Sequence, residues 1–327
     1  MISEYINSFL PVSLNSFRID TIGSFDIFIK SHKNKKEFMI LYHSGGDRFT
    51  GEVRNKLIAN KIEQVYIRAT DKELYHQYIE ENLQDYLKDP HIPTGKKAEF
   101  AHLSISNIAQ SLFDNPQAST ISRYKKTIST TMDFVLDEEE ALKNMIRLTS
   151  YDFTTYTHSV NVGIFAIGLA KVLFVDDPEH NMKEIASGFF LHDIGKCDIP
   201  LSILTKPGPL TENEWSIMKN HPQKGYEILM KFNKLTPEAK VIVLEHHERQ
   251  SGNGYPKGIS GDKIHIYSKV CCIADVFDAL TAKRPYKRAH SCFEALKVMK
   301  EEMFQEFDPY FFNQFVILFS NQAIKSA

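Results

Sequence analysis

The sequence predicts an α+β chain of two domains, in which a small α/β domain at residues 1–90 precedes an all-α helical bundle at residues 141–327. A linker and connector helices are expected between them, at residues 91–140. Three observations support this prediction. The 327 residues exceed the roughly 100 to 200 of one compact unit. Strand-like runs are confined to the first ninety residues, and apolar residues afterwards recur at helical spacings of three and four.

Three short runs rich in β-branched and aromatic residues predict strands in the first domain. They are FDIFIK at 25–30, FMILYH at 38–43 and QVYIRA at 64–69, with turn-forming residues between them. Residues 52–62 and 71–87 space their apolar residues as helices do, and Asp71 is suited to be the N-cap of the second helix. Strands and helices in this order predict a small α/β domain.

The linker is marked by two prolines and a glycine in DPHIPTGKK at residues 89–97. Residues 98–148 then form amphipathic segments, broken at Pro116. An apolar stripe on such connector helices would bury equally well against its own chain or a second copy. Whether the chain forms a homodimer through these helices therefore stays open.

Composition excludes some classes of partner. The net charge of −2, from 39 basic and 41 acidic side chains, gives no electrostatic basis for binding polymeric nucleic acid or an anionic membrane. No apolar run reaches the length that crosses a bilayer, and the N-terminus lacks a secretory signal, so we expect a cytoplasmic protein. The four cysteines lack metal-site spacing and are expected to be reduced.

Histidines after residue 150 fall where helices end. In NMKEIASGFFLHDIGKCDIP an apolar helix carries His192 and Asp193 in its last turn, before a break at Gly195. A histidine beside an aspartate can supply one nitrogen ligand and one carboxylate that bridges two metal ions. In TPEAKVIVLEHHE a second apolar helix carries His246 and His247 to its far end.

Between these segments, Thr211 with Glu214 forms a capping box that predicts another helix start. This helix is expected to turn Trp215, Ile217 and Met218 inward. It should carry His221 near its end, where Pro222 kinks or stops it.

The helix KVCCIADVFDAL contains Asp275 among apolar residues, where a carboxylate is costly unless it is paired or binds a metal. Asp278, one turn further on, is expected to have a simple helix-surface role. Five histidines and two aspartates in these settings together predict a metal centre. The set is His158, His192, Asp193, His221, His246, His247 and Asp275.

The motifs HDIGK, HPQKG, HHERQSGNGYPKG and IADVFDALTAKRPYK resemble those of the HD-GYP family of cyclic di-GMP phosphodiesterases, a branch of the HD metal-dependent phosphohydrolases. The resemblance covers about the last 180 residues and includes EFDPYFFNQF near the C-terminus. It implies an HD-type all-α bundle and an enzyme of bacterial second-messenger signalling. The first domain resembles an α/β module found before some HD-GYP domains, which implies a regulatory or interaction role.

The resemblance also implies two divalent ions, iron or alternatively manganese, bridged by Asp193. One would be held by His158, His192, Asp193 and Asp275, and the other by Asp193, His221, His246 and His247. Some relatives hold a third ion with a glutamate at the position of Thr154, so two ions are expected here. Asp193 and Lys196 would be catalytic, with Lys196 reaching the phosphate. Tyr255, Arg284 and Lys287 would bind substrate with Lys196.

The glycine-rich loop departs from the family pattern at two positions. Ser251 replaces the usual aspartate and Gln250 the usual aromatic residue, so the loop is expected to be looser and turnover weak or its substrate preference altered. The expected reaction opens cyclic di-GMP to pGpG, and a second cleavage to GMP stays open. The alternatives are a weakly active, metal-bound scaffold that binds a cyclic dinucleotide or a signalling protein partner, and an enzyme for another cyclic dinucleotide.

Overall fold

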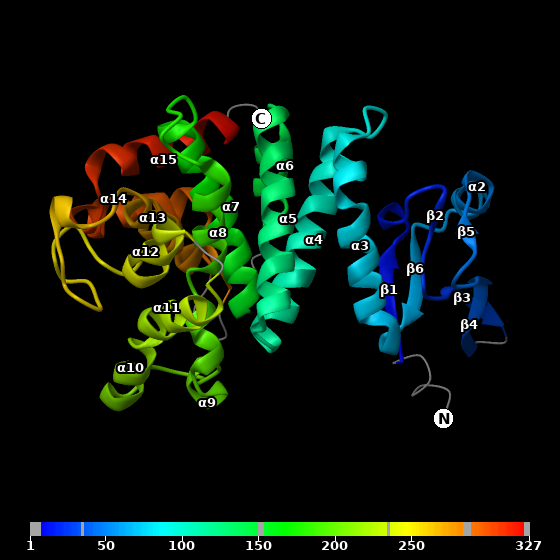
Figure 1. Cartoon of the computed structure of the whole chain (residues 1–327), viewed down its shortest axis with the longest axis horizontal. Coiled ribbons are helices and arrows are strands. Elements are labelled where there is room, and N and C mark those ends of the chain that lie inside the picture. The colour runs from blue at the N-terminus through cyan, green and yellow to red at the C-terminus, as the bar shows by residue number, and fades with distance from the viewer. Residues whose placement is uncertain (1–7, 34–35, 150–153, 234–235, 284–288, 324–327) are drawn as a thin grey trace. The chain divides into compact units, whose positions relative to one another are not determined.

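The computed structural model describes residues 8–33, 36–149, 154–233, 236–283 and 289–323 (Figure 1). The chain divides into two compact units, Met1–Ser104 and Ile105–Ala327. Their boundary falls inside the long helix α4 (Thr94–Asp114), which with α5 (Ala118–Asp137) occupies the predicted connector region.

The first unit contains a four-stranded antiparallel sheet in the order β1-β6-β3-β4. Its strands are β1 (Phe9–Ser13), β3 (Ile27–Lys33), β4 (Lys36–His43) and β6 (Gln64–Arg68), while β2 (Thr21–Ile22) pairs with β5 (Arg48–Phe49). Helices α2 (Gly51–Ala59) and α3 (Lys72–Lys88) complete the unit. The three predicted strands are confirmed, but the sequence pattern missed β1, whose five residues include a proline.

Aromatic side chains form the core of this unit. Phe17 and Phe25 pack against Tyr75 and Tyr78 of α3 with ring centroids 5.7 to 6.1 Å apart. Asp71 does stand at the N-cap of α3, but its side chain makes no capping hydrogen bond. The helix therefore depends on this packing more than on its cap.

The second unit is helical, and no further strand occurs among the described residues after β6. Its remaining helices are α6 (Ala141–Arg147), α7 (Thr155–Phe174), α8 (Met182–Leu191), α9 (Leu201–Leu204), α10 (Glu212–Met218), α11 (His221–Phe232), α12 (Pro237–Glu245), α13 (Ile266–Thr281), α14 (Cys292–Glu302) and α15 (Pro309–Ala323). The predicted order of an α/β domain and an all-α bundle is confirmed.

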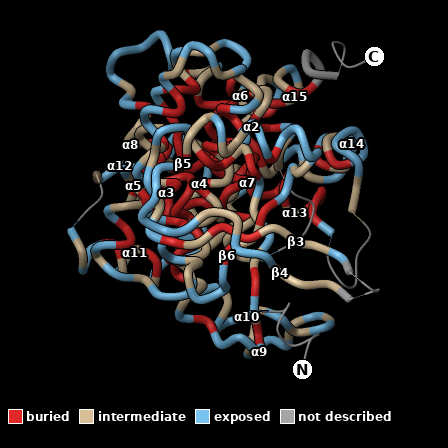
Figure 2. The backbone as a smooth tube through the Cα atoms, turned by 90° about the vertical axis from the view of Figure 1, so that its right-hand side faces the viewer, coloured by how far each residue is buried: buried red, intermediate tan, exposed pale blue. Residues whose placement is uncertain are grey.

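Helix α7 is a central element of the bundle and packs against α6, α8, α13 and α15. Buried residues dominate it, as the red stretches of Figure 2 show. It is long and apolar enough to cross a bilayer, contrary to our expectation, but 78% of its most apolar window is buried within the protein. A Cβ on Gly163 would lie 2.4 Å from the Phe190 ring, so this glycine permits the close contact of α7 with α8.

Helices α10 and α11 differ from the prediction in two ways. The capping box of Thr211 and Glu214 is present, but α10 ends at Met218 and His221 begins α11. Pro222 starts that second helix instead of stopping the first, since its fixed φ suits the first turn. Trp215 and Ile217 do not turn inward: they are 45% and 39% exposed.

Candidate metal centre

The end of α8 forms the floor of the site. His192 is the C-cap, followed by Asp193 and a short 3-10 helix, Ile194–Asp198, and both side chains are fully buried. The turn fits tightly against α11, because a Cβ on Gly195 would lie 1.9 Å from the carbonyl oxygen of His221. A glycine is therefore required where the two helix ends meet.

Three histidines present the same ring nitrogen to the centre. The Nδ1 atoms of His192, His221 and His246 lie 2.8 to 2.9 Å from the carbonyl oxygens of residues three positions earlier. Because a carbonyl only accepts, each Nδ1 carries the proton and each Nε2 of the neutral ring has a free lone pair. The Nε2 atoms of His221 and His246 are 3.2 Å apart. Two lone pairs this close repel each other, and a cation bound by both nitrogens would stabilise the pair.

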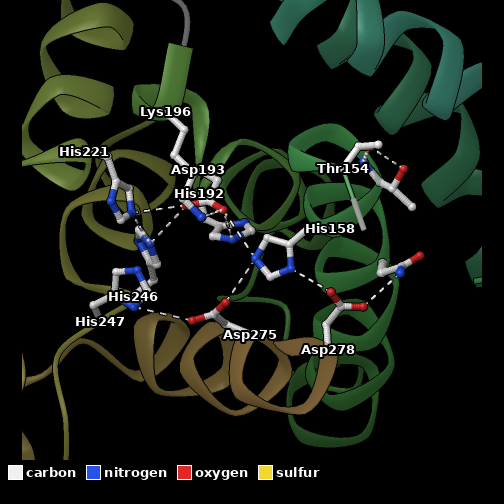
Figure 3. A network of polar contacts seen from close by, with 12 residues as sticks. Thr154, His158, His192, Asp193, Lys196, His221, His246, His247, Asp275 and Asp278 are labelled. Atoms are coloured by element: carbon white, nitrogen blue, oxygen red, sulfur yellow. Dashed lines mark hydrogen bonds and ion pairs between the residues drawn. The ribbon is translucent and has the colours of Figure 1, made fainter. Parts of the chain in front are cut away.

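Asp193 lies between two groups of imidazoles (Figure 3). Its Oδ1 is 3.1 Å from His221 Nε2 and 3.8 Å from His246 Nε2, while its Oδ2 is 3.3 Å from His158 Nε2 and 3.4 Å from His192 Nε2. One carboxylate thus faces both groups, as a bridging ligand must.

Asp275, from α13, links His158 to the remaining histidine, His247. Its Oδ1 is 3.1 Å from His158 Nε2 and its Oδ2 is 3.4 Å from His247 Nδ1. The ligand atoms form two compact groups, each within 4.8 Å: Asp193 with His221, His246 and His247, and His158 with His192 and Asp275. The structure therefore brings together all seven residues that the sequence predicted.

These residues fit a pair of divalent ions. The buried Nε2 of His192 and Oδ1 of Asp193 have no hydrogen-bond partner among the described residues, which is costly unless a cation binds them. Imidazole nitrogen and carboxylate oxygen donors without sulfur are ligands that several divalent metals accept. The two buried clusters are consistent with a two-metal site.

Electrostatics favour the metal-binding protonation states of three histidines and of Asp193. Burial lowers the pKa of His221, His246 and His247, so these rings are neutral. Burial alone would raise the pKa of Asp193, but Lys196 and the neighbouring imidazoles outweigh it and hold that pKa well below its usual range. Neutral imidazoles around an ionised carboxylate form a ready donor set.

Asp278 supports the centre from behind, and the prediction of a surface role was wrong. It is 2% exposed, its Oδ2 accepts a hydrogen bond from His158 Nδ1 at 2.6 Å, and its Oδ1 accepts one from Asn161 Nδ2 at 2.8 Å. This bond fixes the His158 ring with Nε2 toward Asp193 and Asp275. The signal available in the sequence was the spacing of three residues between Asp275 and Asp278. That spacing did not reveal that His158 on α7 is the partner of Asp278.

A cleft of about 810 Å³ opens over the site. Lys196, His221, His247 and Asp275 line it, and Lys196 Nζ donates to Asp193 Oδ2 at 2.5 Å. Tyr255 also lines it, with its ring centroid 4.5 Å from that of His247. The predicted substrate residues Arg284 and Lys287 lie outside the described residues.

Thr154, which was expected to supply no ligand for a third ion, is the N-cap of α7. Its hydroxyl accepts from Thr157 N at 3.1 Å. The residue therefore has a structural use in starting the helix that carries His158.

Two residues next to the paired histidines were not predicted to act. Arg249 lines the cleft, and its Nη1 donates to Cys272 Sγ at 2.5 Å. Glu248 is 1% exposed and accepts from the backbone N–H groups of Lys257 at 2.7 Å and Ile259 at 3.0 Å. A carboxylate and a guanidinium directly after two ligands were the signal available in HHER.

The altered glycine-rich loop is anchored through its own residues. Ser251 Oγ donates to Glu306 Oε2 at 2.7 Å and accepts from Asn253 N at 3.4 Å. The backbone of Gln250 also donates to Glu306 O at 3.0 Å. Ser251 therefore provides hydrogen bonds at the turn that the loss of an aspartate was expected to loosen.

An all-α bundle with two buried His/Asp clusters sharing one aspartate defines a metal-binding helical domain of the HD type. The family model of the HD domain matches residues 140–311. This chain belongs to the HD domain family and is homologous to the HD-GYP cyclic di-GMP phosphodiesterases.

Two curated relatives are named as cyclic di-GMP phosphodiesterases. One from Pseudomonas aeruginosa is 38% identical over 182 residues, which are 56% of this chain and 43% of that protein. One from Thermotoga maritima is 32% identical over 260 residues, 75% of this chain and 69% of that protein. A 3′3′-cGAMP-specific phosphodiesterase 2 from Vibrio cholerae is 45% identical over 134 residues, 41% of this chain and 25% of that protein. The match thus spans less than half of the P. aeruginosa protein.

A solved structure resembles the whole fold. It is an HDG"Y"P protein from Bdellovibrio bacteriovorus, with a TM-score of 0.67 and 22% identity over 95% of this chain and 99% of that one. The similarity includes the N-terminal sheet as well as the helical bundle.

Proposed function

We propose that this chain is a metal-dependent phosphodiesterase that hydrolyses cyclic dinucleotides, and that its substrate is cyclic di-GMP, opened to pGpG. The observation that carries the proposal is the pair of buried His/Asp clusters on either side of Asp193, at the floor of a cleft. No serine, cysteine or threonine nucleophile is needed for this chemistry. The relatives named above support the substrate class.

In this proposal His158, His192, Asp193 and Asp275 hold one ion, and Asp193, His221, His246 and His247 hold the other. Iron, or alternatively manganese, is the proposed metal. When bound, two such ions supply Lewis acidity toward a phosphate and activate water at neutral pH. The protein fixes the ligand orientations in advance through the carbonyl and Asp278 hydrogen bonds of the histidines.

The remaining residues act on the phosphate. Water forms a new bond to phosphorus, the bond from phosphorus to one 3′ oxygen breaks, and that oxygen takes a proton. Lys196 Nζ, already bonded to Asp193, is placed to donate a hydrogen bond to the phosphate or assist the leaving oxygen. Arg249, a cation on the cleft wall, is suited to the second phosphate of a cyclic dinucleotide.

A second substrate has its own support, since the V. cholerae relative named as 3′3′-cGAMP-specific is 45% identical over 134 residues. The chain would act in the cytoplasm, where its first unit could receive a signal or bind a signalling partner. A homodimer remains part of the proposal.

The test is to load protein anaerobically with iron or manganese and incubate it with cyclic di-GMP, 3′3′-cGAMP and cyclic di-AMP. The control is a double variant, His192→Ala with Asp193→Ala. Linear products that exceed those of this variant, fastest with cyclic di-GMP, support the proposal. Faster hydrolysis of 3′3′-cGAMP would reassign the substrate. Binding of a cyclic dinucleotide without product would refute catalysis and favour a scaffold.

A further inference from the structure

The cleft has an aromatic wall that the proposed chemistry does not use. Trp215, the one tryptophan of the sequence, lines the cleft from α10 and is 45% exposed. A large aromatic side chain left partly in water at a cleft wall loses the free energy that burial would provide. Such residues are commonly anchors for ligands.

A row of rings connects this tryptophan to the metal centre. The Tyr255 ring lies tilted at 30° against that of the ligand His247, with centroids 4.5 Å apart. The Trp215 ring approaches Tyr255 at 6.3 Å with an interplanar angle of 72°. The wall that Trp215 forms therefore begins one tyrosine away from the metal ligands.

A cation lies beside both rings. Lys219 Nζ is 5.7 Å from the centroid of Trp215 and 5.8 Å from that of Tyr255. The ammonium group is attracted to the ring faces and can also donate to acceptors of a ligand stacked there. Aromatic faces combined with a cation are the usual chemistry for holding a nucleotide base.

Helix α10 is held firmly enough to present this wall. Glu214 accepts from the backbone N–H and the hydroxyl of Thr211, and Lys206 Nζ bonds the same carboxylate at 2.5 Å. The Trp215 side chain follows directly on this capped turn. A rigid helix start therefore sets the position of the ring.

We propose that Trp215 is a stacking residue for one purine base of the cyclic dinucleotide. This inference rests on the proposed function for the identity of the ligand. A phosphate on the cleft floor places the base of the same nucleotide one sugar away, along the wall that Tyr255 and Trp215 form. Lys219 then donates to purine N7, an acceptor that guanine and adenine share. The stacking surface therefore strengthens binding without distinguishing cyclic di-GMP from 3′3′-cGAMP.

The first test compares the kinetics of Trp215→Ala and Trp215→Phe. Base stacking on an aromatic side chain contributes about 1–3 kcal/mol, so Trp215→Ala should raise KM about 5- to 150-fold for both dinucleotides, with kcat within about threefold. Trp215→Phe should restore most of the affinity. The matched control is Phe293→Ala, which removes an aromatic ring, 77% exposed, from α14 outside the residues that line the cleft.

The second test uses fluorescence, since all tryptophan emission comes from residue 215. Cyclic di-GMP should quench this emission in the metal-loaded protein, with a midpoint that matches its affinity by calorimetry. Calorimetry of Trp215→Ala should show the same 5- to 150-fold weakening. Quenching with that weakening supports stacking even if the protein proves to bind cyclic di-GMP without hydrolysing it.

Three results would overturn the inference. Turnover with no quenching, or with KM unchanged in Trp215→Ala, removes the stacking residue and leaves the proposed phosphodiesterase intact. If the metal-loaded protein shows neither turnover nor quenching with any of the three dinucleotides, both the inference and the proposed function fail. A KM increase as large in Phe293→Ala as in Trp215→Ala would also reject a specific stacking role.

Discussion

Replacing Asp278 by asparagine should weaken the metal centre without touching a proposed ligand. The carboxylate is 2% exposed and accepts two hydrogen bonds, from His158 Nδ1 at 2.6 Å and Asn161 Nδ2 at 2.8 Å. Asparagine has nearly the same volume, but only one of its two polar atoms accepts. One of the two donors must therefore face an N–H₂ group, and the negative charge behind His158 is lost.

The size of the effect follows from these two bonds. Loss of a carboxylate behind a metal-binding histidine typically weakens metal binding 10- to 100-fold, or by about 1.4–2.7 kcal/mol. A buried donor left without an acceptor costs a further 1–3 kcal/mol or so in the free energy of unfolding. We expect Asp278→Asn to show both losses, and excess metal to restore part of kcat/KM.

The assay is competition for manganese between the protein and a chelator of known affinity, beside thermal unfolding of the metal-free protein. Asp262→Asn is the control, because the Asp262 side chain is fully exposed and the substitution changes the net charge equally. The reasoning fails if Asp278→Asn binds manganese within twofold of the unchanged protein. It also fails if Asp262→Asn weakens binding as much.

Other predictions follow from features of both units. Glu248→Ala should lower the free energy of unfolding in urea by about 3–6 kcal/mol, because the loop loses two hydrogen bonds to a charged acceptor. A change below about 1 kcal/mol would contradict this. Burial lowers the pKa of His102 from about 6.5 to about 4, so the unfolded chain binds the extra proton between these values and stability falls as pH drops from 6.5. Between pH 7 and pH 5 this histidine should lower the free energy of unfolding in urea by about 2 kcal/mol. The variant His102→Gln should not show this loss, and equal pH dependence in both proteins would refute the prediction. Gly195→Ala should prevent the close fit of the turn after α8 against α11 and so lower the metal content, and metal content near that of the unchanged protein would contradict this. Chelation should lower the melting temperature, since the buried carboxylate of Asp193 loses its cations, and an unchanged transition would contradict the two-metal site.

The local features of the fold were predictable because they depend on neighbours in the sequence. The capping box at Thr211 and the cap at Thr236 are both present, since an N-cap needs only the backbone three residues ahead. The three strongest strands were found for a similar reason: alternating β-branched and aromatic residues report on a half-buried strand. Strand β1 was missed because its five residues include a proline, which breaks the strand pattern, and only their pairing with β6, more than fifty positions away, makes them a strand.

The sequence by itself determined which residue types gather at the centre, because five histidines and two aspartates at helix ends and within apolar helices have few other uses. Only the tertiary structure decided how they meet: it turned Asp193 between two imidazole groups and placed Asp278 behind His158, 120 positions earlier in the chain. It also decided that Trp215 faces the cleft instead of the core. Periodicity identifies an apolar residue on a helix, but the direction it faces depends on which other helices pack there, and that is a property of the whole fold.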